Sequence, residues 1–194
     1  MNEPLTQEIN DPPQVAPVLK QPSLRELISQ IVYAFDHFLS GGELAELRRL
    51  KPHDQASPTF FKISALYLDP AGILPNGITE RNQAEQKWAC ILARMASLHG
   101  LHNPNSSIGS ALAEAGFSEL RFVRLLRAKN EALFDVIHGA ANYLSSKGIS
   151  VNFGDFASLV LSDGFDHSEN VRREIARKYY SAINQNTQEG AKKI

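Results

Sequence analysis

Residues 106–130 read SSIGSALAEAGFSELRFVRLLRAKN, and this stretch decides what kind of fold the chain can adopt. Its first part predicts a short helix that ends at Gly116, because glycine readily adopts the backbone conformation that follows a helix C-terminus. Ser118 then predicts the N-cap of a second helix, with the Glu119 carboxylate in the first turn, where the helix dipole favours negative charge. The stretch is therefore predicted to form two helices joined by a glycine turn.

The second of these helices has one face to bury and one to expose. At about 100° per residue its apolar side chains fall on one broad arc, and they are Phe122, Val123, Leu125 and Leu126. Arg121, Arg124 and Arg127 lie largely opposite that arc. A guanidinium group can donate two hydrogen bonds to one phosphate at any physiological pH, so this row suits a polyanion. An ordinary solvated face is the other interpretation of the three arginines.

Helical spacing of apolar residues continues on both sides of this hairpin and predicts an all-α protein. The expected further helices run over about residues 24–39, 43–51, 58–67, 80–99, 131–147, 156–161 and 168–184. Residues 23–26 have the spacing of a capping box, and Ser40-Gly41-Gly42 is expected to end the first helix. We expect a compact bundle of about eight helices, built as one unit or as two small sub-bundles.

Proline and polar residues mark the two ends of the predicted domain. Residues 1–22 contain five prolines and few large apolar side chains. Such a composition cannot offset the entropy lost on ordering, so a flexible tail is expected there. The predicted helical domain spans residues 23–185, and residues 186–194 are expected to form a polar tail that frays.

Composition and charge restrict the class of protein. Of the 194 residues 43% are hydrophobic, which is enough to fill a core. No apolar run is long enough to span a membrane, and the N-terminal stretch lacks the apolar segment of a signal peptide, so we expect a cytoplasmic protein.

The net charge is −1, but residues 1–47 hold two basic and seven acidic residues, leaving 18 basic and 14 acidic residues beyond them. Nucleic-acid binding would therefore depend on local cationic patches.

The sequence offers no candidate catalytic or metal site. Its closest histidine pair, His99 and His102, straddles a predicted helix end and has no cysteine or carboxylate nearby in the sequence. Cys90 lies in an apolar helical pattern, which favours an inert core thiol. No phosphate-binding glycine loop, nucleophile elbow or HExxH helix is present. We therefore expect no metal, no other cofactor and no enzymatic activity.

Three segments together carry a family resemblance. They are GELAELRRLKP at residues 42–52 with Pro58-Thr59-Phe60, SIGSALAEAGFSELRFVRLLRA at residues 107–128, and VRREIARKYY at residues 171–180. In this order they resemble the small subunit of the type I-E CRISPR Cascade complex, over about residues 39–182. The central segment is the most specific, because its two glycines are followed by SE-x-RF-x-RLLRA.

The resemblance implies an all-helical, non-catalytic protein that binds nucleic acid within a larger complex. Members of this family lie as two head-to-tail copies beside the crRNA-bearing backbone subunits and the large subunit of Cascade. They help to hold the target DNA strand and the displaced strand, which stabilises the R-loop. The positions that match the family motifs are Arg48, Arg49, Arg121, Arg124 and Arg127. Ser110 departs from the pattern, because the family often has a basic residue after the glycine that corresponds to Gly109.

The candidate nucleic-acid-binding residues are therefore Arg48, Arg49, Lys51, Arg121, Arg124, Arg127, Arg173 and Lys178. We expect the arginines of two separate helices to converge into one cationic track. For Arg173, an ion pair with Glu169 four residues earlier is the competing interpretation. For the whole protein, the alternative is a helical scaffold or adaptor whose arginines meet acidic patches on protein partners only.

Overall fold

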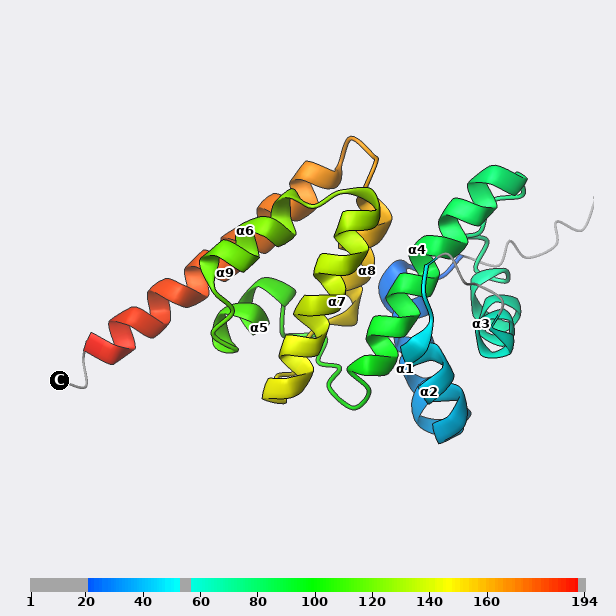
Figure 1. Cartoon of the computed structure of the whole chain (residues 1–194), viewed down its shortest axis with the longest axis horizontal. Helices are drawn as coiled ribbons and strands as arrows, with labels where there is room; N and C mark the ends of the chain where they lie inside the picture. The colour runs from blue at the N-terminus through cyan, green and yellow to red at the C-terminus, as the bar shows by residue number, and fades with distance from the viewer. Residues whose placement is uncertain (1–20, 53–56, 192–194) are drawn as a thin grey trace, which may run out of the picture.

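The chain folds into an all-α structure, as the sequence predicts (Figure 1). This computed structural model describes residues 21–52 and 57–191. Within them the helices are α1 (Leu24–His37), α2 (Gly41–Arg49), α3 (Pro58–Ile63), α4 (Ile78–Ser97), α5 (Ile108–Glu114), α6 (Glu119–Arg127), α7 (Asn130–Lys147), α8 (Phe153–Ser162) and α9 (Ser168–Ala191), with a π-helical turn, η1 (Ser64–Leu68), after α3. Most of the predicted N-terminal tail, residues 1–20, lies outside the described part. No helix of that part is long and apolar enough to cross a membrane.

Serine side chains start the first two helices. Ser23 and Ser40 each accept a hydrogen bond from the backbone amide of a glutamate, and that glutamate accepts one from the serine amide in return. The sequence predicts this capping box at Ser23. At Ser40 it predicts the end of a helix, and the structure shows a helix start instead. The reason is that α1 has already ended at His37, so the Ser40 hydroxyl and Glu43 complete the first turn of α2.

The molecule has two ends that share one core. Helices α4 and α7 lie near the middle, with α1, α2 and α3 on one side and α5, α6 and α9 on the other (Figure 1). Helix α8 contacts α4, α7 and α9 and so closes the centre. The buried apolar side chains of the described residues form a single cluster that includes residues from α1 through to α9. The predicted sub-bundles are therefore parts of one packed unit.

A close contact between α5 and α9 anchors the hairpin that carries the arginine row. Gly116 ends α5 with a φ of 75°, a left-handed conformation that favours glycine, as the sequence predicts. Gly109 lies against the α9 backbone, where a Cβ atom would overlap the carbonyl oxygen of Ile175 and lie 2.8 Å from the amide nitrogen of Tyr179. Glycine at this position therefore lets the two helix backbones approach each other directly.

Helix α9 is longer than the sequence pattern indicates. The apolar spacing predicts an end near Asn184, but the helix continues to Ala191. Residues 185–191 have no apolar stripe, yet glutamine, glutamate and alanine are good helix formers, and each added residue gains a backbone hydrogen bond once a helix exists. The predicted boundary after residue 185 therefore falls inside a helix.

Candidate nucleic-acid interface

Aromatic packing fixes which face of α6 is exposed. The Phe122 ring stacks on the Tyr179 ring of α9, with centroids 3.7 Å apart and planes 11° from parallel. The Tyr179 hydroxyl donates a 2.6 Å hydrogen bond to the carbonyl oxygen of Phe117, just before α6. Phe122 and Leu125 are fully buried. Because this face is held against the core, the predicted arginine row on the other face remains exposed.

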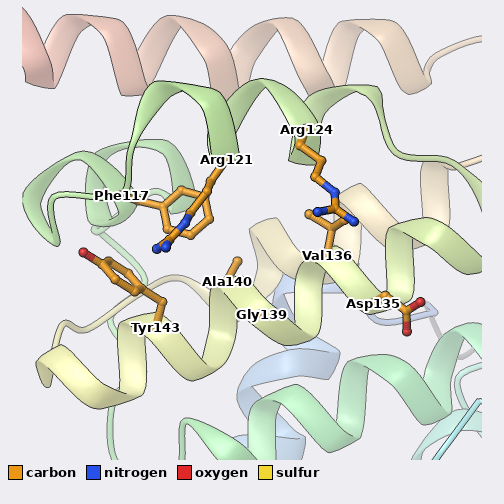
Figure 2. Close-up of a pocket in the computed structure, with 8 residues that line it drawn as sticks. All are labelled: Phe117, Arg121, Arg124, Asp135, Val136, Gly139, Ala140 and Tyr143. Atoms are coloured by element: carbon orange, nitrogen blue, oxygen red, sulfur yellow. The ribbon is translucent and has the colours of Figure 1, made fainter.

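The exposed face of α6 borders a channel between α6 and α7, here called the α6–α7 groove. One stretch of it, about 290 Å³, is lined by Phe117, Arg121, Arg124, Gly139, Ala140 and Tyr143 (Figure 2). A second stretch, about 400 Å³, is lined by Leu120, Val123, Arg124, Arg127, Ala128 and Ala132. Asp135 and Val136 line both stretches, as does Arg124, so the two adjoin. The groove therefore brings together all three arginines of the row.

The guanidinium groups in this groove are available to a ligand. Within the described residues, none of Arg121, Arg124 and Arg127 forms an ion pair with a carboxylate. Asp135 lies in the groove, but its carboxylate points away from the two guanidinium groups drawn beside it (Figure 2). An unpaired, exposed guanidinium keeps its donors free for a phosphate.

Tyr143 lines the groove and Lys147 lies beside its ring, and neither is among the site residues predicted from the sequence. The Tyr143 ring lies 5.8 Å from the Arg121 guanidinium carbon and 5.9 Å from the Lys147 Nζ, within the range of cation–π attraction. Its hydroxyl donates to the carbonyl oxygens of Ala115 and Gly116 at 3.1 and 3.2 Å, which fixes the ring against the end of α5. The sequence signal was the i,i+4 spacing of Tyr143 and Lys147 on one predicted helix face.

The α2 candidates lie at the other end of the molecule. Arg48, Arg49 and Lys51 are exposed, but α4 and α7 separate α2 from α6 (Figure 1). Arg48 also has a structural contact, because its Nε donates a 2.9 Å hydrogen bond to the carbonyl oxygen of Ala96 near the end of α4. The expectation that the arginines of α2 and α6 converge into one cationic track is therefore wrong. The arginines form two separate groups.

The α9 candidates do not join the α6–α7 groove either. The Arg173 Nη1 donates to the Oδ1 of Asn170 at 3.3 Å, so the predicted ion pair with Glu169 is replaced by a neighbouring polar contact. Lys178 lines a different cleft of about 420 Å³ beside Asp155 and Glu174. Two carboxylates in that cleft make it less suited to a phosphate than the α6–α7 groove.

A buried ion pair, missed from the sequence, holds the corner where α6 meets α7. Arg172 and Asp163 are 4% and 6% exposed, and the Arg172 Nη2 lies 2.7 Å from the Asp163 Oδ1. The Arg172 Nη1 donates to the carbonyl oxygens of Leu126 and Ala128 at 2.7 and 2.9 Å, while the Asn130 amide donates to the Asp163 Oδ2 at 2.6 Å. The pair thus fixes the end of α6 and the start of α7. Arg172 lies three residues before Ile175 and seven before Tyr179, so all three share one face of α9. This helical spacing could have predicted the burial of Arg172.

His99, His102 and Cys90 do not line the α6–α7 groove. The His99 Nε2 lies 2.9 Å from the Asp36 Oδ1, a carboxylate that is distant in the sequence, and both line a cleft of about 130 Å³ with His102. The His102 Nδ1 accepts a hydrogen bond from the Phe153 amide, and burial lowers the pKa of His102. Burial raises the pKa of the Cys90 thiol to about 12. No cluster of three or more metal-ligating side chains occurs in residues 21–52 and 57–191.

The fold and this groove define a class of protein: an all-helical protein with a row of exposed arginines along a surface channel, none of them ion-paired within residues 21–52 and 57–191. The sequence model of the family described as CRISPR-associated protein Cse2 matches residues 43–180. The match covers more than half of the chain, so the chain belongs to the Cse2 family. The resemblance that the three sequence segments carry is thereby confirmed.

Two solved structures share the fold. CasB from Thermobifida fusca is 17% identical in sequence, with a TM-score of 0.62 over 80% of this chain and 94% of that one. A chain of the E. coli Cascade structure, bound to a PAM-containing dsDNA target, is also 17% identical, with a TM-score of 0.60 over 80% of this chain and 96% of that one. No curated protein matches this chain in sequence.

Proposed function

We propose that this chain is a non-catalytic subunit of a type I-E CRISPR Cascade complex and that its α6–α7 groove holds the phosphate backbone of DNA in the R-loop. Membership of the Cse2 family and the shared fold with a chain of DNA-bound E. coli Cascade support the assignment to the complex. The observation that carries the binding role is the row of Arg121, Arg124 and Arg127 along one groove, without ion pairs in the described residues.

A small number of phosphate contacts is enough for this role. R-loop formation exchanges a DNA duplex for an RNA–DNA duplex of similar stability, so a few contacts to the strand backbones can shift the equilibrium. Such contacts need no base-specific readout. The proposed partners are the target and displaced DNA strands, the crRNA, the Cascade backbone and large subunits and a second copy of this chain. The group of Arg48, Arg49 and Lys51 would supply a second point of contact at the other end of the molecule.

A charge reversal tests the binding role. The variant Arg121→Glu/Arg124→Glu should fold, since both side chains are exposed, and should lose affinity for labelled single-stranded DNA. Each phosphate contact to a single strand contributes roughly 0.7 to the slope of log affinity against log salt, so losing two lowers the slope by about 1.4. The control Arg25→Glu/Arg177→Glu makes the same change in net charge on α1 and α9 and should alter the slope far less.

The same variants distinguish the adaptor function. If the wild-type chain binds no DNA even at low salt, and its Cascade forms R-loops equally well with and without the reversal, the phosphate-binding role is wrong. Protein partners would then be the better explanation of the surface. An exposed aromatic cluster at the C-terminal end of α1 favours that alternative, since Tyr33 and Phe38 are 54% and 61% exposed and their rings lie 5.6 Å apart.

A further inference from the structure

We propose that the α6–α7 groove accepts an unpaired nucleobase beside its arginines, so that the chain binds single-stranded nucleic acid in preference to duplex. This inference rests on the proposed function and adds the kind of nucleic acid that the groove recognises. The shape and chemistry of the groove floor support it. A site that binds only phosphate does not require these features.

The groove combines a cationic rim with an apolar recess. Arg121 and Arg124 form its α6 side, while Val136, Gly139 and Ala140 supply its α7 side (Figure 2). A nucleotide has the same two parts, a charged phosphate and a flat base with apolar faces. The recess has a volume of about 290 Å³, close to the lower limit of roughly 300 Å³ for pockets that bind small molecules. It can therefore hold one base.

Gly139 is the residue that keeps the recess open. It lies inside α7, where glycine lowers helix stability relative to alanine. Its φ is not positive, so the backbone conformation does not require glycine. A Cβ atom at this position would meet nothing within 4 Å, so helix packing does not require it either, in contrast to Gly109. The open space beside Gly139 leaves room for a ligand to approach the α7 backbone closely.

Rigid flat groups border the recess. The Tyr143 ring is fixed by its two hydroxyl hydrogen bonds and by an edge-to-face contact with Phe117, whose centroid lies 5.3 Å away. The Arg121 guanidinium lies over this ring. Guanidinium planes and aromatic rings are the groups on which unstacked bases are held in proteins that bind single strands. Because the Tyr143 ring is already fixed, ordering it on binding costs little.

Single strands fit this arrangement better than duplexes. In a duplex each base is stacked and paired, and extruding one costs free energy that a single strand does not lose. A duplex could therefore contact the arginines only through its phosphates. Base stacking contributes ~1–3 kcal/mol per base, which corresponds to about a 5-fold to 150-fold gain in affinity for a strand that inserts one base.

A substitution that fills the recess without changing charge tests the inference. In the full chain, Gly139→Leu occupies the groove floor and leaves every arginine in place, and Gly139→Ala is the matched control with a small side chain. Each variant is titrated with three labelled probes of equal length: a thymidine strand, an abasic strand and a duplex. We expect Gly139→Leu to weaken binding of the thymidine strand about 5-fold to 150-fold. Its affinity for the abasic strand and for the duplex, and the slope of log affinity against log salt, should stay unchanged.

A comparison that needs no variant guards against loss of folding in Gly139→Leu. The wild-type chain should bind the thymidine strand more tightly than the abasic strand by the same factor. Equal affinity for these two probes, or equal weakening of all three by Gly139→Leu, would overturn the base pocket. If those results appear while Arg121→Glu/Arg124→Glu still reduces binding, the proposed function stands and the base pocket alone is wrong. If no probe binds the wild-type chain at low salt, the proposed function fails as well.

Discussion

Replacing Arg172 should destabilise the protein more than any other single change to a charged residue on α9. Arg172→Met leaves the Asp163 carboxylate buried without its cation, and it leaves the carbonyl oxygens of Leu126 and Ala128 without the donor that reaches both. Removing one partner of a buried ion pair typically costs about 3–5 kcal/mol. Since whole domains are stable by about 5–15 kcal/mol, this single change should remove a large fraction of the free energy of unfolding.

A second substitution separates the charge effect from the loss of packing. Asp163→Asn removes the charge and keeps one oxygen that can accept the hydrogen bond from the Asn130 amide, while its NH2 group replaces the oxygen that accepts from Arg172. In the double variant Arg172→Met/Asp163→Asn no unpaired carboxylate remains. We therefore expect the double variant to be more stable than Arg172→Met alone, with a coupling free energy of about 1–3 kcal/mol.

Urea unfolding followed by far-UV circular dichroism measures these differences. The matched control is Arg173→Met, because Arg173 is the exposed neighbour and should change stability by less than about 0.5 kcal/mol. A loss below about 1 kcal/mol for Arg172→Met would refute the reasoning, as would a double variant in which the two losses simply add. Either result would mean that the corner between α6 and α7 is held by packing and not by the buried pair.

Three further predictions concern other parts of the fold. Gly109→Ala should lower stability by about 1–3 kcal/mol in thermal unfolding, because the new methyl group overlaps the α9 backbone, whereas Gly139→Ala should not destabilise the protein. Glu43→Gln should lower the melting temperature at pH 7 and have a much smaller effect at pH 2. A hydrogen bond from Lys62 and then one from Ser40 lower the pKa of Glu43 from 4.5 to about 2. Its stabilising effect is therefore fully present above pH 4.5 and is lost as pH falls through about 2. Cys90 should resist maleimide at pH 8 in the native protein and react after unfolding, because burial raises its pKa to about 12; rapid labelling of the native protein would contradict this.

Local signals in the sequence predict the hairpin of α5 and α6 well. Gly116 follows the end of α5 and Ser118 takes the N-cap position of α6, although the Ser118 side chain makes no capping hydrogen bond in the described part of the chain. The burial of Phe122 and Leu125 and the exposure of Arg121 follow from helical periodicity in the same way. The arginine row and its accessibility could therefore be predicted without a structure.

Contacts between distant segments could not be predicted in this way. The spatial relation of α2 and α6 depends on how α4 and α7 pack, and a single sequence carries no direct signal for it. The Asp36 carboxylate beside His99 is a similar case, because a long stretch of chain separates the two residues. The α7 side of the groove was also missed, since Gly139 has significance only once α6 lies opposite it.

The separation of the two arginine groups has a physical consequence for a bound strand. Between them lie the C-terminal turns of α7 and α4, which are linked by a 3.3 Å hydrogen bond from the Ser145 hydroxyl to the carbonyl oxygen of Ser97. Helix C-termini carry partial negative charge that repels phosphates. Lys147 in the last turn of α7 and Arg48, bonded to the Ala96 carbonyl, offset that charge at the two turns. If the α6–α7 groove holds a strand, as proposed, these two cations would reduce the repulsion between its phosphates and the two helix ends where the strand passes toward α2.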